Sequence, residues 1–370
     1  MTKPKLLCIL HRSPPNHGAA KVGDFIASSN LLNDCFECRF ITIKSSDTIG
    51  DIGKFSLKKV YFVILLYLKI LWALITFRPD KIYFTACIRS VAFYRDLLIS
   101  TLWKIYSLLK KVDIYFHYHT KGIDEFVSES SKNLFLTRFF VKDVNICLLS
   151  PMLEKDFSKV NSFKRITYLP NGVEDTLSGI DFNHTLALKY DSQGQLNVLY
   201  LSNMIKSKGY FLVLELANKT KDDSIVYHFA GGWESADDEK EFFDYIDAND
   251  LSDTVVFHGF VSGEKKRKLF ENAHLFIFPT RYKKEAFPLS ILEALSYGVP
   301  VIATDEASIP YILDNRSGIV LNDVSKLDDA LSVATKDLMS IEVAKYCRDR
   351  FLKNFTLQQF ESNLIKILKG

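Results

Sequence analysis

The stretch from His274 to Ala303 constrains the fold of this chain more than any other, because it holds a strand, a loop, a helix and a second strand in succession. The apolar run His274 to Phe278 predicts a buried strand that leads into a polar loop. Pro288 suits the first turn of a helix, where its missing N–H is not needed. Gly298 and Pro300 end that helix before the next apolar run. This order predicts a parallel sheet covered by helices.

Two carboxylates flank the predicted helix, Glu285 before it and Glu293 eight residues later. The free N–H groups of the first helical turn form a ready site for an anion, and Lys283 and Lys284 add positive charge. An anion bound there would have both carboxylates nearby as acceptors for hydroxyl groups. A phosphate-bearing polyol such as a nucleotide-sugar satisfies all of these groups. The bare pair of glutamates indicates only a solvated helix face, and the full pattern around it favours the binding site.

The size and composition of the chain limit its class. Its 370 residues favour two domains, and 48% apolar with 25% charged residues suffice for large cores and a soluble surface. A net charge of +3 argues against a protein that binds nucleic acid by neutralising phosphates. Cys35 and Cys38 form one C-x-x-C without the further ligands of a zinc site, so we expect free thiols. The chain opens on a strand pattern without a signal peptide, which predicts a cytoplasmic protein.

Two stretches of the first half are unusually apolar. Val60 to Phe77 is interrupted only by Lys69, and Val91 to Lys111 mixes Leu, Ile, Trp and Tyr with Arg and Lys. The first is shorter than the ~20 clean residues of a membrane span and carries its lysine in mid-span, so we expect crossover helices. One interpretation is that both stretches are core helices, and their inner sides must indeed pack in the core. For the remaining apolar surface we expect docking on a membrane surface, without a span.

Short apolar runs recur along both halves and alternate with helical patterns. The predicted strands include Lys5 to Leu10, residues 36–43, Lys81 to Thr85, Asp113 to Phe116, Asn145 to Leu149, Asn197 to Leu201, Ile225 to Ala230 and Thr254 to His258. A helix capped by Ser150 with Pro151 in its first turn follows the fifth of these runs. The alternation predicts two doubly wound α/β domains, whose ligands bind at the carboxyl ends of the strands.

Three loops at such strand ends carry candidate residues. Gly18 lies in the loop of residues 12–20, where it permits close approach of a ligand, although an ordinary strand-to-helix turn is an equally good interpretation. His117 and His119 end another strand and point to the same side, and a metal site there lacks a visible third ligand. Lys206 and Lys208 stand at a further helix start, beside a glycine.

The motif Phe-Pro-Thr…Glu-Ala-Phe-Pro-Leu-Ser-Ile-Leu-Glu-Ala-Leu-Ser-Tyr-Gly-Val-Pro-Val-Ile-Ala resembles the donor site of retaining glycosyltransferases with the GT-B fold, family 4. The Lys208–Gly209 pair, the Pro-Asn-Gly-Val turn of residues 170–173 and the strand end at 257–261 are similar to the same family. The resemblance is close over residues 197–322 and looser over 5–173. It implies two Rossmann-like domains facing each other across a cleft: an acceptor-binding domain (1–173), a linker (174–195), a nucleotide-sugar-binding domain (196–352) and a C-terminal helix that crosses back (353–370).

The resemblance also implies an activity, the transfer of a hexosyl group from a nucleotide-diphosphate sugar with retention at the anomeric carbon. In that reaction Glu285 orients the donor sugar, Glu293 holds the ribose hydroxyls, and Lys208 grips the diphosphate. His119 contacts the donor sugar as a second catalytic residue. The other donor-binding positions are Gly18, Asn203, Gly259, Phe287, Leu289 and Ser290. The leaving phosphate itself accepts the proton of the acceptor, so no separate base is expected.

One position departs from the family, because Asn203 stands where an arginine is usual and weakens the phosphate clamp unless Lys206 replaces it. The chain has no Asp-x-Asp to hold a divalent cation, so we expect no metal and no cofactor. Lysines and helix N-termini would then neutralise the leaving diphosphate.

The apolar first domain suggests a glycan or lipid-linked acceptor, as in bacterial surface polysaccharide biosynthesis of the O-antigen or capsule type. The protein would then be cytoplasmic, and peripheral on the inner face of the cytoplasmic membrane. The alternatives are a nucleotide-sugar epimerase on the same fold and a non-catalytic module that binds glycans or membranes.

Overall fold

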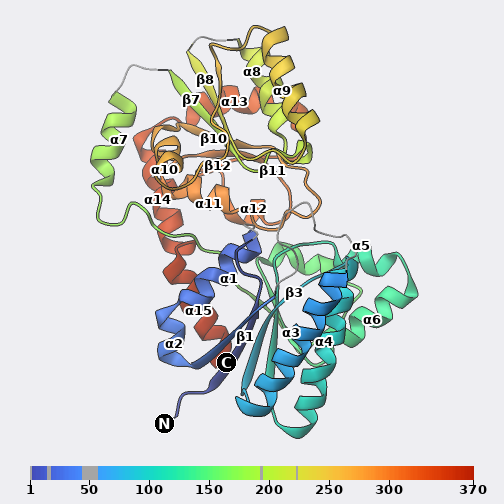
Figure 1. The fold of residues 1–370 in the computed structure, drawn as a ribbon. Helices are drawn as coiled ribbons and strands as arrows, with labels where there is room; N and C mark the ends of the chain where they lie inside the picture. Colours follow the sequence, from blue (N-terminus) through green and yellow to red (C-terminus); the bar gives the residue numbers. More distant parts are fainter. Residues whose placement is uncertain (1, 15–17, 44–56, 192–194, 222–223) are drawn as a thin grey trace. The chain divides into compact units, whose positions relative to one another are not determined.

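The computed structural model describes residues 2–14, 18–43, 57–191, 195–221 and 224–370. The chain forms two compact units, one of Met1–Asn171 with Leu357–Gly370 and one of Gly172–Thr356 (Figure 1). Each unit contains a six-stranded sheet in which neighbouring strands pair in parallel. The prediction of two doubly wound α/β domains is therefore confirmed.

The sheet of the first unit has the strand order β2-β1-β3-β4-β5-β6. Its strands are β1 (Lys5–Leu10), β2 (Glu37–Thr42), β3 (Lys81–Ala86), β4 (Asp113–Tyr118), β5 (Asn145–Leu148) and β6 (Arg165–Tyr168). Side chains of β1, β3, β4 and β5 are almost all buried, as expected of parallel strands covered on both faces.

Two groups of helices cover this sheet. The first group is α1 (Gly18–Ser28), α2 (Asn30–Cys35) and α15 (Leu357–Lys369), and the second is α3 (Leu57–Thr76), α4 (Ser90–Leu109) and α6 (Ser131–Val141). Cys8 of β1 belongs to one buried cluster with Val22 of α1 and Leu364 of α15, so the last helix completes this core. In the second group, Trp103 of α4 packs against Phe84 of β3 with ring centroids 5.0 Å apart. The short helices α5 (Ile123–Ser128) and η2 (Pro151–Phe157) complete the unit.

The second unit has the strand order β12-β11-β10-β7-β8-β9. Its strands are β7 (Leu196–Leu201), β8 (Ile225–Ala230), β9 (Val255–Phe257), β10 (Leu275–Phe278), β11 (Val301–Thr304) and β12 (Gly318–Leu321). The helices around it are α7 (Phe182–Asp191), η3 (Lys206–Lys208), α8 (Tyr210–Thr220), α9 (Ala236–Ala248), α10 (Gly263–Asn272), α11 (Leu289–Ser296), α12 (Ile309–Ile312), η4 (Val324–Lys326), α13 (Leu327–Asp337) and α14 (Ile341–Asn354).

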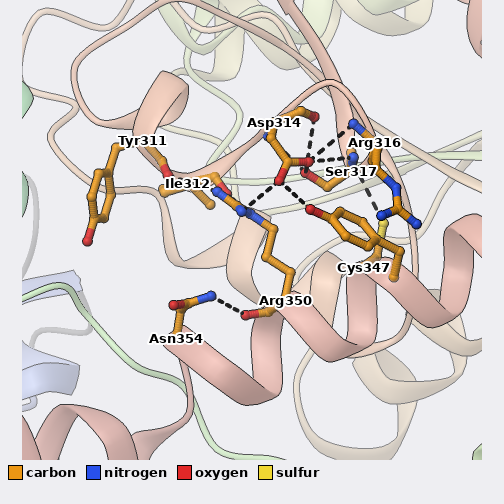
Figure 2. A network of polar contacts seen from close by, with 9 residues as sticks. Tyr311, Ile312, Asp314, Arg316, Ser317, Cys347, Arg350 and Asn354 are labelled. Atoms are coloured by element: carbon orange, nitrogen blue, oxygen red, sulfur yellow. Dashed lines mark hydrogen bonds and ion pairs between the residues drawn. The ribbon is translucent and has the colours of Figure 1, made fainter.

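A polar network around Asp314 fixes the turn between α12 and β12 to helix α14 (Figure 2). The Asp314 carboxylate accepts hydrogen bonds from Tyr346 Oη at 2.6 Å and Arg350 Nη1 at 2.7 Å. Arg350 Nε also donates to the carbonyl oxygen of Ile312 at 2.7 Å. Burial alone would raise the pKa of Asp314, but the hydrogen bonds from Tyr346 and Ser317 and the charge of Arg350 lower it below its usual range. The carboxylate therefore stays ionised and anchors the turn.

Arg348 of α14 is buried and joins three separate segments of the second unit. Its guanidinium lies 2.7 Å from Asp175 Oδ1 and donates to the carbonyl oxygen of Ser296, at the end of α11, at 2.8 Å. The segment that follows residue 172 is thereby attached to the helices of this unit. Removing either side chain would leave the other charge of this pair without a partner. We therefore interpret the pair as a structural contact.

Residues 174–195, which were predicted to form a linker, contain helix α7 in their middle part. Asp181 supplies the N-terminal acceptor that starts this helix, with Oδ1 3.0 Å from the amide of Asn183. Leu186 of α7 is buried, so the helix contributes to the core of the second unit. The polar composition of the segment does not reveal that Leu186 and Lys189 are buried.

The segment after Ser150 differs from prediction in two details. The helix after Ser150 is the 3-10 helix η2, and the Ser150 side chain makes no capping hydrogen bond. Over the described ranges, no helix is both long and apolar enough to cross a membrane.

Candidate donor site

The loops after β7 and β10 meet at the point where the strand order of the second unit reverses. The chain runs outward from β7 through β8 to β9 on one side and from β10 through β11 to β12 on the other. The carboxyl ends of two such strands flank the usual ligand position of an open parallel sheet. The amide of Arg281 donates to the carbonyl oxygen of Ser207 at 2.7 Å, which ties the two loops together.

Gly209 allows these loops to approach so closely. Its φ of +89° lies in the left-handed region, and a Cβ atom added there would lie only 2.5 Å from the carbonyl oxygen of Pro279. A larger residue would be strained and would push the loops apart. The glycine therefore sets the position of the preceding residue, Lys208.

Lys208 and Glu285, predicted to belong to one site, form an ion pair. The distance from Lys208 Nζ to Glu285 Oε2 is 3.3 Å, and their side chains are 17% and 11% exposed. Glu285 Oε2 is buried, yet it has no hydrogen-bond donor among the described residues, because the lysine lies outside hydrogen-bond geometry. A buried carboxylate oxygen without a donor is costly unless a ligand supplies one. Glu285 is thus placed to accept a hydrogen bond from a bound hydroxyl group.

Helix α11 begins directly after this pair. Pro288 is the N-cap residue, with an extended ψ of 117°, and so directly precedes the first helical turn, to which it was predicted to belong. The first two helical residues are Leu289 and Ser290, both half-buried, and their amide groups have no acceptor within the helix. The helix ends at Ser296, and Gly298 follows with a φ of +66°, which confirms the predicted stop.

Glu293 is also paired with a lysine, which the sequence analysis did not identify. Lys266 of α10 places Nζ 2.5 Å from Glu293 Oε2, and each side chain is 20% exposed. Lys266 lies in a run of basic residues at 265–268, where no spacing rule singles out one lysine. Only the packing of α10 in the folded unit selects it.

The other predicted residues of this unit have varied environments. Asn203 is exposed in the loop after β7, and Gly259 follows β9 with its carbonyl oxygen accepting from the amide of Gly231 at 2.9 Å. Phe287 is buried against Tyr311 and Phe355, so its side chain belongs to the core.

Lys206, which could have replaced the missing arginine, pairs instead with Glu241 of α9, with Nζ 2.5 Å from Oε2.

Two predicted residues, His119 and Gly18, lie in the first unit. His119 follows β4 directly, and its ring centroid is 4.0 Å from that of the buried His117. Tyr83 Oη lies 2.5 Å from His117 Nδ1. Gly18 begins α1, and an added Cβ atom would meet no atom within 4 Å. Residues 15–17 of the predicted loop lie outside the described residues.

The buried histidine predicts an acid-sensitive first unit. Burial, and then the neighbouring His119, lower the pKa of His117 well below 6.5, so the folded protein holds it neutral. Below a pH of about 6.5 the unfolded chain binds a proton that the folded unit does not, so stability falls with falling pH. We expect His117→Gln to reduce this loss by up to about 1.4 kcal/mol per pH unit. Urea unfolding of both proteins between neutral and mildly acidic pH measures it, and identical slopes would contradict it.

No cluster of three or more His, Cys, Asp or Glu side chains in the described parts of the chain is arranged to hold a metal ion. The charges that face the β7–β10 switch point come from lysines, carboxylates and a helix N-terminus. Such a set can bind a phosphate and hydroxyl groups side by side.

Comparison with known proteins relates part of this chain to one family. The sequence model of "Glycosyl transferases group 1" matches residues 189–350. The chain is 25% identical over 179 residues to a Klebsiella pneumoniae protein described as an uncharacterized 41.2 kDa protein in the cps region, covering 48% of this chain and 47% of that protein. It is 23% identical over 189 residues to the putative colanic acid biosynthesis glycosyltransferase WcaL of Escherichia coli K12, covering 47% and 45%. These alignments span about half the length of the curated relatives.

Solved structures match the whole chain. The sucrose-phosphate synthase of Thermosynechococcus elongatus superposes with a TM-score of 0.72 at 15% identity, covering 99% of this chain and 98% of that one. HepE of Anabaena in complex with UDP superposes with a TM-score of 0.69 at 14% identity, covering 99% of each chain. At this identity the likeness shows the fold alone. The chain therefore has the two-domain GT-B fold of these solved glycosyltransferase structures, and its residues 189–350 match the sequence model of the glycosyl transferases group 1.

Proposed function

We propose that the protein transfers a sugar from a nucleotide-diphosphate sugar to a glycan or lipid-linked acceptor, with retention at the anomeric carbon and without a metal. The observation that carries the proposal is the Lys208–Glu285 pair at the β7–β10 switch point, with Glu285 Oε2 lacking a hydrogen-bond donor among the described residues. Names of relatives support the acceptor class, since they include colanic acid and O-antigen glycosyltransferases of Escherichia coli. Bacterial surface polysaccharide biosynthesis is the setting that fits these names.

Each charged group of the site has a role in this reaction. Lys208 and the first amides of α11 bind the diphosphate and neutralise the charge that develops on it as the sugar leaves. Glu285 accepts hydrogen bonds from hydroxyl groups of the donor sugar and so orients it. Glu293 accepts hydrogen bonds from the ribose hydroxyls. Since Lys266 already pairs with this carboxylate, the lysine has to move away or share the carboxylate with the ribose. His119 contacts the donor sugar as the second catalytic residue, and a phosphate oxygen takes the proton of the acceptor.

A thermal-shift panel of UDP, GDP, ADP and CMP, each with and without EDTA, tests the donor site. A nucleotide that binds only the folded state stabilises it by about 2.7 kcal/mol at a concentration of about 100 times its dissociation constant. We expect one nucleoside diphosphate to raise the melting temperature clearly, and EDTA to leave this rise unchanged. HepE was solved with UDP bound, which makes UDP the first ligand to try.

The remaining outcomes of the panel are decisive. A shift that EDTA abolishes would contradict the metal-free site. The absence of any shift would contradict the donor site itself and favour a non-catalytic binding module. Release of an isomerised free sugar from the matching nucleotide-sugar, with no acceptor present, would indicate an epimerase.

A further inference from the structure

Helices α3, α4 and α6 expose a large amount of apolar side chain on the side that faces away from the sheet of the first unit. The exposed large apolar residues are Val60, Tyr61, Ile64, Leu68, Leu71, Trp72 and Ile75 of α3, Val91, Tyr94, Leu98, Ile105, Leu108 and Leu109 of α4, and Phe135 and Phe139 of α6. We call these side chains the outer face. Patches of this extent on a soluble protein mark sites of interaction.

The helices that carry the outer face already pack against the rest of the first unit with their inner side. Ile70 and Leu74 of α3 are buried, as are Ile99 and Trp103 of α4. Helices α3 and α4 run side by side along the sheet (Figure 1), and Lys104 of α4 lies with Nζ 4.9 Å from the ring centroid of Phe139 of α6. The exposed side chains therefore form a second surface on this layer of helices, with no role in the core.

Charge identifies the partner. Along the whole length of α3, α4 and α6 the sequence has a single carboxylate, Asp96, and it is completely buried and paired with Arg95 at 2.7 Å. The basic residues Lys69, Lys132 and Arg138, in contrast, are exposed on these helices. An apolar surface with cations and no exposed carboxylate on its helices complements the surface of a membrane that contains anionic lipids.

The aromatic residues favour the same partner. Trp72 and Tyr61 are 66% and 62% exposed on α3, and Tyr94 is 44% exposed on α4. Rings with one polar atom concentrate at the boundary between lipid headgroups and acyl chains. A second copy of the chain is a poorer partner, because a two-fold contact sets this cationic surface against itself.

We propose that the outer face of α3, α4 and α6 docks on the surface of an anionic lipid bilayer, with Trp72 and Ile75 inserted at the headgroup boundary. Lys69 lies between the apolar residues Leu68 and Trp72 and contacts lipid phosphate. This inference does not depend on the transfer reaction. It states which side of the first unit meets the membrane.

Flotation of the full chain with vesicles tests the proposal. We expect binding to vesicles of phosphatidylcholine mixed with phosphatidylglycerol, and much weaker binding to phosphatidylcholine alone. The double variant Trp72→Glu, Ile75→Glu should lower the partition coefficient on the order of 100-fold, because it replaces inserted apolar groups with charges. Lys69→Glu should lower it roughly tenfold on anionic vesicles and little on neutral ones.

Leu188→Glu is the matched control, since Leu188 is 65% exposed on α7 of the second unit. It should bind vesicles like the unaltered protein. Equal binding of the double variant and this control would overturn the proposal, as would a lack of dependence on anionic lipid. A concentration-dependent dimer without vesicle binding, dissociated by the double variant, would identify a second copy as the partner instead. The thermal shift with nucleoside diphosphate should persist in the double variant, which separates this test from that of the donor site.

Discussion

Replacing Glu285 by Gln should lower kcat by a factor on the order of 10²–10³ while leaving nucleoside diphosphate binding nearly unchanged. Glutamine preserves the shape of the side chain but removes the charge that Glu285 holds 3.3 Å from Lys208 Nζ. The charge matters most when positive charge develops on the donor sugar, so its loss affects the transition state more than the bound substrate. The measurement is donor turnover, using the nucleotide-sugar whose nucleoside diphosphate raises the melting temperature.

The control for this variant is Glu239→Gln, on the exposed side of α9. It removes the same charge from the same unit without touching the switch point, so kcat should not change. An unaltered kcat in Glu285→Gln would contradict the proposed role of Glu285. A raised KM for the nucleotide-sugar together with this unaltered kcat would assign Glu285 to uniform binding of the donor.

Replacing Arg348 by Ala should destabilise the second unit by about 3–5 kcal/mol. The change leaves the Asp175 carboxylate, only 20% exposed, without its cation, and leaves the carbonyl oxygen of Ser296 without this donor. It also removes the cation–π contacts of the guanidinium with the rings of Phe182 and Phe351. Urea unfolding followed by tryptophan fluorescence measures the effect, with Trp233 reporting on this unit.

Lys345→Ala, an exposed position on the same helix, should change the unfolding free energy by less than about 0.5 kcal/mol. The double variant Arg348→Ala, Asp175→Asn should be more stable than the sum of the single effects predicts, because the two side chains act as a pair. Additive effects would show that Arg348 stabilises the unit through its other contacts.

The sequence predicted the strands well where burial is complete. The bounds of β1 and β8 agree with the predicted runs, since strands covered on both faces are continuous apolar segments. β4 is longer than its predicted run because it continues through the buried polar residue His117. β6 escaped prediction for the opposite reason, since this four-residue strand is only partly buried and includes Arg165 and Thr167.

The site was predictable only to the extent that it follows from local pattern. Glu285 and Lys208 are 77 positions apart, yet both follow strands that flank the switch point, so topology alone brings them together. Lys266 could not be found in this way, because its pairing with Glu293 depends on the rotation of α10 about its own axis. The same limit applies to Lys206, whose pairing with Glu241 depends on the position of α9.

The order of the two units along the chain has a consequence for biosynthesis. The first unit is discontinuous, and its core includes Phe360 and Leu364 of α15. The second unit is continuous, and its two ends are joined by the amide of Val173, which donates to the carbonyl oxygen of Phe355 at 3.0 Å. A ribosome therefore releases all residues of the second unit before the first unit has received its closing helix. The unit that begins later is complete earlier. Until α15 arrives, the face of the first sheet that α1 and α2 cover lacks part of its apolar cover, and chaperones can reach the side chains that α15 later buries.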